Sequence, residues 1–248
     1  MSVGYVSQIV FENQIPEGSY LQGLPVVQHL QKHPRLSFEA GVTILVGENG
    51  TGKSTLLEAI AVACGFNPEG GSRNFRFSTN DTHSELHECL RIVRRAYPKD
   101  GYFLRAESLY NVATNIEELD RMPGFLPPLV DSYGGRSLHH QSHGESFLAL
   151  VQNRLGGNGL YLFDEPEAAL SPMRQMTLLA EIDRLVKEGS QLIIATHSPI
   201  LMAYPGACIY ELSEQGIAHV DYKDTEHYRI TKQFLDAPER MLRYLIEL

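Results

Sequence analysis

One short run of this sequence has the composition of a phosphate-binding loop. Three glycines precede Lys53 and Ser54 in the spacing G-x-x-x-x-G-K-[ST]. Glycine permits a tight turn whose backbone N–H groups point at phosphate oxygens, while a lysine ammonium reaches the β- and γ-phosphates and a hydroxyl binds Mg²⁺. An accidental glycine turn is the plainer alternative. The residues that we expect to bind the nucleotide are Gly47, Glu48, Asn49, Gly50, Thr51, Gly52, Lys53, Ser54 and Thr55.

A second motif is a pair of acids at the end of an apolar run. Residues 160–163 read Leu-Tyr-Leu-Phe, and Asp164 and Glu165 follow directly. A buried strand that ends in carboxylates places them at the sheet edge where open α/β folds bind ligands. We expect Asp164 to hold Mg²⁺ through its hydration shell, and Glu165 to orient or deprotonate the attacking water. The alternative is a solvated acidic turn, which the upstream loop makes a minor one.

A histidine follows the next apolar run. The segment Thr196-His197-Ser198-Pro199 comes directly after residues 191–195, which read as a buried strand. A single histidine is usually structural. Because this one is placed at the same predicted sheet edge as the other two motifs, we expect His197 to contact the γ-phosphate.

A fourth motif, Ser142-His143-Gly144-Glu145-Ser146, stands just before a predicted helix. Backbone N–H groups at that helix start, together with the Ser142 hydroxyl, could bind the phosphate of a second nucleotide. The structural alternative is a capping box, with Ser142 as the cap and Glu145 three residues later. Both interpretations can hold at once.

Alternating strands and helices must position these motifs. Val42–Val46 is apolar on every side chain but one and predicts a strand, and helical spacing follows from Lys53 to a stop at Cys64-Gly65. Further strands are predicted at 101–106, 160–163 and 191–195, and helices at 108–119, from 143, and from Ser171-Pro172 to Gly189. A helix capped by Asp81 or Thr82 should carry Leu86, Leu90 and Val93. Residues 207–220 predict a hairpin, and residues 225–248 predict helix. The fold class is α/β, with a mainly parallel sheet covered on both faces.

Composition narrows the class of protein. The chain has 248 residues, 43% of them hydrophobic, and a formal net charge of −9. An acidic chain argues against a broadly basic nucleic-acid-binding face. Its 3 cysteines lack metal-ligand spacing and fit free thiols. Free thiols fit a reducing compartment, so we expect a cytoplasmic protein. Because the sequence has neither a membrane-spanning run nor a signal-peptide layout, we expect no membrane span of its own.

Taken in order, the four motifs resemble the ATP-binding-cassette (ABC) superfamily of ATPases, over about residues 42–199. The resemblance implies a single P-loop NTPase head over 1–248, with an N-terminal antiparallel β element and a helical signature lobe at about 80–156. It also implies a homodimer in which two head-to-tail subunits hold ATP and Mg²⁺ between the phosphate loop of one and the signature of the other. Ser142, Gly144 and Glu145 would then act in trans.

The sequence departs from the transporter form of that family. His143 stands where glycine is usual, Glu145 where glutamine is usual, and Ser171 where aspartate is usual. No metal-contacting glutamine is evident after the middle strand, and Glu107 is the substitute that we assign. These departures look more like stand-alone ATPases related to the heads of SMC-type, RecF-type and OLD-type proteins.

We therefore expect a soluble Mg-dependent ATPase that couples dimer closure and reopening to a DNA or protein partner, with DNA maintenance or defence as its setting. Two alternatives stay open: a nucleotide-gated switch with little hydrolysis, and the ATPase subunit of a membrane transporter. A kinase or GTPase would not explain the ordered signature and histidine. Either Tyr5 or Tyr20 could stack on adenine, and spacing selects neither.

Overall fold

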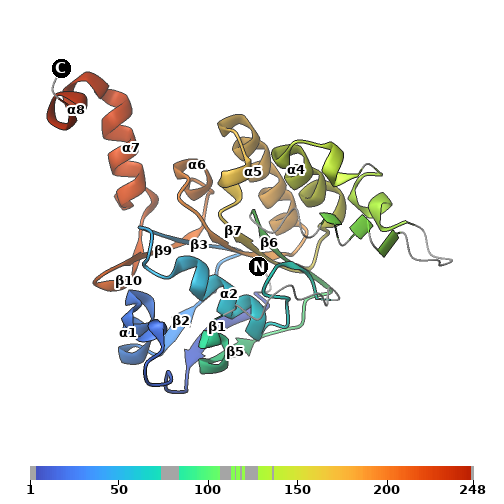
Figure 1. Cartoon of the computed structure of the whole chain (residues 1–248), viewed down its shortest axis with the longest axis horizontal. Coiled ribbons are helices and arrows are strands. Elements are labelled where there is room, and N and C mark those ends of the chain that lie inside the picture. The colour runs from blue at the N-terminus through green and yellow to red at the C-terminus, as the bar shows by residue number, and fades with distance from the viewer. Residues whose placement is uncertain are drawn as a thin grey trace.

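The computed structural model describes residues 4–73, 84–106, 113–114, 116–117, 119–120, 128–135 and 137–246. Within these residues the chain alternates between strands and helices (Figure 1). The strands are β1 Val6–Phe11, β2 Arg35–Ser37, β3 Val42–Gly47, β4 Gly71–Ser72, β5 Leu90–Arg94, β6 Asp100–Arg105, β7 Gly159–Asp164, β8 Gln191–Ala195, β9 Cys208–Ser213 and β10 Gly216–Val220. The α-helices are α1 Pro25–Lys32, α2 Lys53–Ala63, α4 His143–Arg154, α5 Pro172–Lys187, α6 Pro199–Met202, α7 Glu226–Asp236 and α8 Pro238–Leu245.

The central sheet has the strand order β10-β9-β3-β8-β7-β6-β4. Neighbours from β9 to β6 are parallel, whereas β10 and β4 pair antiparallel at the two edges. Since β3, β8 and β7 are adjacent and parallel, their carboxyl ends meet at one sheet edge. Those ends are Gly47, Ala195 and Asp164, so the segments that follow them lie next to one another.

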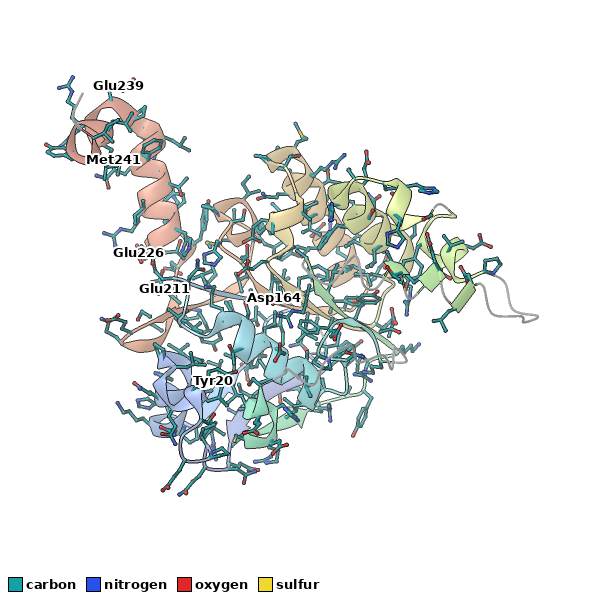
Figure 2. The ribbon with its side chains drawn as sticks, viewed as in Figure 1. Tyr20, Asp164, Glu211, Glu226, Glu239 and Met241 are labelled. Atoms are coloured by element: carbon teal, nitrogen blue, oxygen red, sulfur yellow. The ribbon has the colours of Figure 1, made fainter. Side chains whose placement is uncertain are left out.

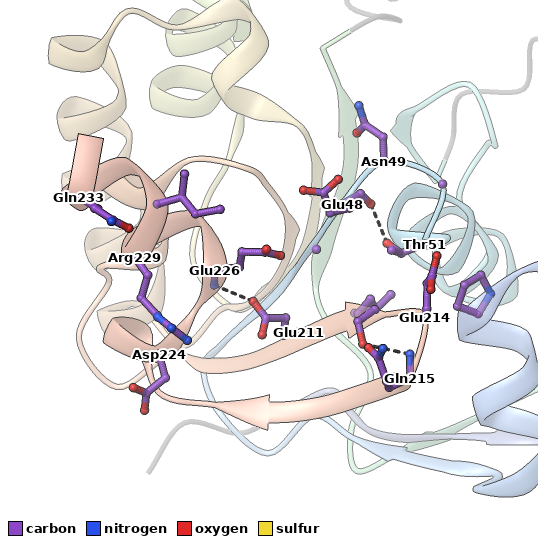
Figure 3. Close-up of a pocket in the computed structure, with 16 residues that line it drawn as sticks. Glu48, Asn49, Thr51, Glu211, Glu214, Gln215, Asp224, Glu226, Arg229 and Gln233 are labelled. Atoms are coloured by element: carbon purple, nitrogen blue, oxygen red, sulfur yellow. Dashed lines mark hydrogen bonds between the residues drawn. The ribbon is translucent and has the colours of Figure 1, made fainter. Parts of the chain in front are cut away.

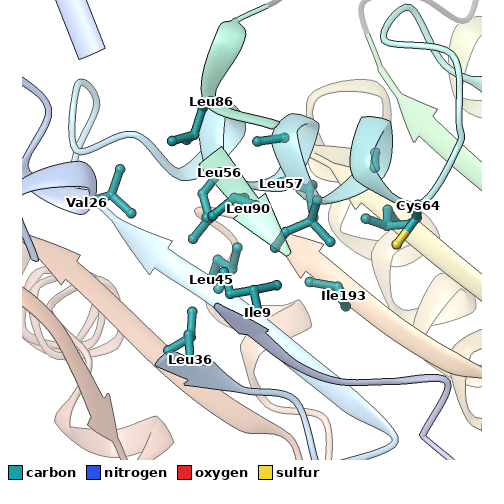
Figure 4. Close-up of a cluster of buried hydrophobic side chains, with 14 of the residues drawn as sticks. Ile9, Val26, Leu36, Leu45, Leu56, Leu57, Cys64, Leu86, Leu90 and Ile193 are labelled. Atoms are coloured by element: carbon teal, nitrogen blue, oxygen red, sulfur yellow. The ribbon is translucent and has the colours of Figure 1, made fainter. Parts of the chain in front are cut away.

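Both faces of this sheet are covered, which explains why β3, β7 and β8 are buried at every residue. The helices α1 and α2 and the small β1-β2-β5 sheet lie on one face, and α4, α5 and α6 lie on the other (Figure 1). One apolar cluster packs α2 between the two sheets, with Leu45, Leu56 and Ile193 among its buried members (Figure 4). A second cluster packs α4 and α5 on the opposite face.

A buried glutamine joins the two sheets. Gln191 of β8 accepts a hydrogen bond from Val6 N at 2.9 Å, and its amide donates to Val6 O and Phe38 O at 2.8 and 2.9 Å. The N-terminal antiparallel sheet, in the order β2-β1-β5, is thereby fixed against the main one. The predicted α/β fold, with a mainly parallel sheet and an N-terminal antiparallel element, is confirmed.

Two predictions of local structure need correction. The predicted helix through Leu86, Leu90 and Val93 is wrong: Glu85–Cys89 is a 3₁₀ turn capped by Ser84, and β5 follows it. Pairing with β1 outweighs the helical spacing, because β1 supplies β5 with backbone partners from Val6 to Phe11. Within the predicted lobe of 80–156, β5 and β6 therefore belong to the two sheets.

The predicted C-terminal helix is divided. It is α7 and α8, separated at Ala237, where φ is −153°. The break has a local cause, since the residue before Pro238 is pushed out of the helical region. Both helices project from the body (Figure 1), and none of their residues is buried.

Candidate functional site

The phosphate loop has the backbone that its glycines permit. Gly50 and Gly52 adopt φ of 83° and 94°, and Gly52 is the residue before α2, whose first residue is Lys53. A Cβ on Gly47, where φ is 140°, would lie 2.1 Å from Leu212 O, so no larger residue fits. The loop therefore ends in a helix N-terminus, whose free N–H groups favour an anion.

Lys53 is folded back onto this loop. Its side chain is buried, and its Nζ donates to Glu48 O at 2.9 Å, as does the Thr51 hydroxyl at 2.8 Å. Burial lowers the pKa of Lys53, while the carboxylates of Glu165, Asp164, Glu167 and Glu48 act in the opposite direction. The ammonium thus stands within an acidic surround and can exchange a carbonyl for phosphate oxygens.

The two acids at the end of β7 differ in environment. Asp164 is 6% exposed, whereas the Glu165 side chain is 41% exposed and lies 3.7 Å from His197 Nε2. Glu165 has a positive φ of 47°, which is uncommon for a residue other than glycine. Backbone strain of this kind is found at functional sites more often than elsewhere. The structure brings Glu165 and His197 together, as the sequence predicted from the parallel strands.

His197 is held by a network that the sequence analysis missed. Glu167 accepts hydrogen bonds from the Thr196 hydroxyl, at 2.7 Å, and from His197 N. Burial raises the pKa of Glu167, and these two donors oppose that shift. Glu167 stands two residues after Glu165, and its place on the loop behind the acid pair was the one signal available.

Arg105 is a second residue that sequence reasoning missed. Its guanidinium lies 2.7 Å from Glu58 on α2 and 3.5 Å from Asp164 Oδ2. The pairing of β6 with β7 places Arg105 opposite Asp164, so neighbouring strands dictate the contact. Glu107, the predicted metal ligand from this segment, lies outside the described residues.

The oxygen donors here fit Mg²⁺. Ser54 lies in the first turn of α2, and Asp164 is the last residue of β7, at the same edge of the sheet. A hydroxyl and a carboxylate are oxygen ligands of the kind that Mg²⁺ takes beside nucleotide phosphates and water. In the part of the chain that the structure describes, no group of three or more His, Cys, Asp or Glu side chains is placed to hold a metal ion.

The signature motif is a complete capping box. Ser142 Oγ accepts from Glu145 N, and the Glu145 carboxylate accepts from both Ser142 N, at 2.9 Å, and Ser142 Oγ, at 2.7 Å. Arg174 of α5 donates to Ser142 Oγ and to Glu145, each at 3.1 Å. A Cβ on Gly144 would lie 2.6 Å from Ala169 O. The structural interpretation of this motif is thus confirmed, and its polar groups already have partners within the chain.

A cavity of about 760 Å³ lies beside the phosphate loop (Figure 3). Residues 47–51, the β9–β10 turn and the first turns of α7 line it, and Lys53, Asp164, Glu165 and His197 do not. Five of its side chains are acidic and one is basic, Arg229. An acidic lining disfavours a triphosphate, so this cavity adjoins the phosphate site without being it.

The structure separates the two tyrosines left open for adenine. Tyr5 is buried, and its hydroxyl donates to Gly189 O, which precedes β8 at the end of the sheet away from the phosphate loop. Tyr20 is 67% exposed and begins the turn before α1, and α1 contacts the loop through Val26 N and Thr51 O. Tyr5 is therefore excluded from stacking on adenine, and stacking by Tyr20 stays a prediction.

Two families and several known proteins are similar to this chain in sequence. A family described as "AAA domain" matches residues 26–111, and one described as "AAA domain, putative AbiEii toxin, Type IV TA system" matches residues 134–203. An "Uncharacterized ABC transporter ATP-binding protein" of Haemophilus influenzae is 28% identical over 240 residues, which cover 90% of this chain and 89% of that protein. The cobalt import ATP-binding protein CbiO of Salmonella typhimurium is 30% identical over 205 residues, 78% of this chain and 71% of that protein. This chain belongs to the ABC superfamily of ATPases.

Solved structures agree with the fold of the ATPase. An ATP-binding cassette of an ABC transporter superposes with a TM-score of 0.52 at 17% identity, covering 97% of this chain and 98% of that one. The cbiO1 protein of Clostridium perfringens superposes with a TM-score of 0.51 at 17% identity, over 98% of this chain and 100% of that one. At such identities the likeness concerns the fold alone. None of the described helices of the ATPase is long and apolar enough to cross a membrane.

Proposed function

We propose that this ABC ATPase binds ATP between two head-to-tail copies and hydrolyses it to drive closure and reopening of the dimer. The observation that carries the proposal is the split of its motifs. Lys53, Glu165 and His197 gather at the carboxyl ends of β3, β7 and β8. Among the described residues, no hydrogen bond or ion pair joins residues 142–145 to them. A second copy would supply the missing signature.

We assign each residue a role that its surroundings support. The helix N-terminus and the Lys53 ammonium bind the phosphates, and Ser54 and Asp164 would hold Mg²⁺, which when bound would neutralise phosphate charge. Glu165, the more exposed acid, orients or deprotonates the attacking water. His197 donates to the γ-phosphate. Ser142 and the N–H groups at the start of α4 contact that phosphate from the second copy, after exchanging their partners in the capping box.

The substitution Glu165→Gln tests this assignment. It removes the base and keeps the shape, so ATP binding should persist, phosphate release should fall by about two orders of magnitude or more, and an ATP-dependent dimer should accumulate. Phosphate release and sedimentation velocity are the measurements. Glu239→Gln, on an exposed residue of α8 at the far end of the projecting arm (Figure 2), is the matched control. Wild-type turnover by Glu165→Gln would overturn the role of Glu165.

The dimer cycle acts on a further macromolecule, a DNA or protein partner, in the proposal that we favour. The departures from the transporter form at His143, Glu145 and Ser171 support it. A transporter subunit is the second candidate, supported by the names of the relatives, which include an import ATP-binding protein. Affinity purification of Glu165→Gln with ATP separates them, because a permease should appear in the membrane fraction only for the transporter role.

A further inference from the structure

A second histidine touches the histidine of the ATPase site. His227, in the first turn of α7, places its Nε2 2.9 Å from Nδ1 of His197, with the ring centroids 5.1 Å apart. His227 belongs to neither the phosphate loop nor the signature. The four motifs of the sequence give it no role, and only the fold brings it to the sheet edge.

Hydrogen bonds fix the start of α7 to the body of the protein, and they thereby hold His227 against His197. Thr225, the N-cap, is fully buried, and its hydroxyl donates to Tyr222 O at 2.8 Å. The next residue, Glu226, donates its backbone N–H to the Glu211 carboxylate of β9 at 2.9 Å. Glu226 and Glu211 meet at the base of α7, whereas Glu239 and Met241 lie at its far end on α8 (Figure 2). His227 therefore sits at the anchored end of an otherwise projecting arm.

The contact makes the position of one proton decisive. Only one hydrogen can lie between the two ring nitrogens, and the other nitrogen of His197, Nε2, faces Glu165 Oε1 at 3.7 Å. That Nε2 is buried and, among the described residues, has no hydrogen-bond partner. If His227 donates, a neutral His197 carries its proton on Nε2. If His197 donates, its Nε2 turns a lone pair toward a carboxylate and toward phosphate.

The charges around the pair favour the first arrangement. Glu165 and a γ-phosphate are both anionic acceptors, which attract an N–H and repel a lone pair. Burial lowers the pKa of both histidines, and the Lys53 ammonium lowers both further; the carboxylates of Glu165 and Glu48 at His197, and of Glu211 and Glu226 at His227, act in the opposite direction without reversing the shift. Each ring therefore carries a single proton near neutral pH, and the choice of tautomer has to come from a neighbour.

We propose that His227 is a positioning residue of the ATPase: its Nε2–H donates to His197 Nδ1 and so fixes His197 as the tautomer that presents Nε2–H to the γ-phosphate. The proposal rests on the γ-phosphate role of His197 in the proposed function. It assigns to α7 a part in turnover that does not require α7 to touch the nucleotide. It also makes the C-terminal arm and the ATPase site neighbours through one hydrogen bond.

The tautomer can be observed directly in the full chain. Long-range ¹H–¹⁵N correlation spectra of ¹⁵N-labelled protein, assigned with His197→Gln and His227→Gln, distinguish Nε2–H from Nδ1–H. We expect the Nε2–H form of His197 in the wild type, and a mixture in His227→Leu. A His197 that carries its proton on Nδ1 in the wild type would overturn the proposal. This readout does not depend on any ATPase activity.

A matched pair of substitutions tests the direction of the hydrogen bond in turnover. In His227→Gln the side-chain amide reaches as far as the imidazole Nε2 and can donate a hydrogen bond. In His227→Glu the carboxylate has the same shape but, once ionised, can only accept. We expect His227→Gln to keep most of kcat. His227→Glu and His227→Leu should lower kcat about tenfold to a hundredfold with KM for ATP little changed, because the phosphate loop binds ATP. His219→Ala, on the exposed face of β10, is the control.

The outcomes distinguish the role of His227 from the ATPase mechanism on which it rests. Wild-type kcat in His227→Leu, or equal losses in His227→Gln and His227→Glu, would overturn the role of His227 while the ATPase mechanism stands. If His197→Gln itself leaves kcat unchanged, the γ-phosphate role of His197 fails. A thermal melt of each variant shows whether a loss of kcat reflects unfolding.

Discussion

The two halves of the proposed ATP site are built differently. In the phosphate-loop half, Lys53 bonds a backbone carbonyl, and His197 keeps a buried nitrogen that has no hydrogen-bond partner among the described residues. In the signature half, Ser142 and Glu145 bond each other, and Arg174 bonds both. The first half presents donors to a ligand. In the second half, the polar groups already hydrogen-bond one another as a helix cap. These internal hydrogen bonds must be exchanged before the signature can bind phosphate.

The largest effect should come from the half with the free donors. Lys53→Ala removes charge-assisted hydrogen bonds that contribute about 1.5–3 kcal/mol each, so affinity for ATP should fall on the order of tenfold to a hundredfold. Equilibrium binding of a fluorescent ATP analogue measures this. Lys99→Ala removes an exposed lysine far from the loop and should bind normally. Equal affinities for the two variants would contradict the assignment of the loop.

Ser142→Ala should act on stability and leave ATP binding by the monomer unchanged. Loss of an N-cap hydroxyl costs about 1 kcal/mol of unfolding free energy, because the N–H of Glu145 loses its acceptor. Urea unfolding measures the cost. If Ser142→Ala instead weakened binding of ATP to isolated monomers, the phosphate loop and the signature would belong to one site within one chain.

The halves should also lose stability in different pH ranges. Burial lowers the folded-state pKa of His197 and His227 below 6.5, so the folded protein binds fewer protons and becomes less stable as the pH falls below 6.5. The pKa of Glu145 is lowered by the hydrogen bonds from Ser142, so its contribution is lost only as the pH falls below 4.5. The pKa of Glu167 is raised, so its contribution to stability changes with pH in the opposite direction. Glu167 is present in the wild type and in every variant, so it does not affect the comparison between them.

Denaturant unfolding between pH 7 and 5 checks this order. The slope of stability against pH should be smaller in His197→Gln and His227→Gln than in the wild type, and unchanged in Glu145→Gln. A wild-type slope in both histidine variants would show that these imidazoles are not the groups that titrate.

Arg174→Ala should have the smallest effect on stability. Its bonds to Ser142 and Glu145 lie between side chains that are 35% and 53% exposed, so the change should stay within about 0.5 kcal/mol. The same substitution frees Ser142 Oγ from one of its partners. Thermal melts without ATP measure the loss of stability, and melts with ATP measure whether the freed hydroxyl changes the stabilisation by ATP. A loss well above that size would mean that Arg174 holds the signature helix in place.

Local chemistry explains which parts of the site were predictable. The glycine loop, Asp164, Glu165 and His197 each follow an apolar strand, so the parallel sheet alone brings them to one edge. Glu167 and Arg105 act through contacts between neighbouring elements, and their sequence context does not distinguish them from solvated charges. His227 lies 30 residues beyond His197 and meets it only because the start of α7 is bonded to β9, where Glu226 N donates to the Glu211 carboxylate.

The fold was predictable to the same degree and for the same reason. Apolar runs such as 42–46 and 191–195 identify strands buried on both faces, and these were correct. The segment Leu86 to Val93 has helical spacing, and its partner strand β1 lies about 80 residues earlier in the chain. Pairing at that separation is a tertiary property, which no local pattern reveals.

Mixing two inactive variants tests the composite site most directly. Lys53→Ala lacks a working phosphate loop and Ser142→Phe lacks a working signature, so each alone should release little phosphate. In a mixed dimer the intact loop of one subunit meets the intact signature of the other, and the mixture should release phosphate well above the mean of the two variants. A mixture that only averages them would show that each chain holds a complete site and would contradict the two-copy account.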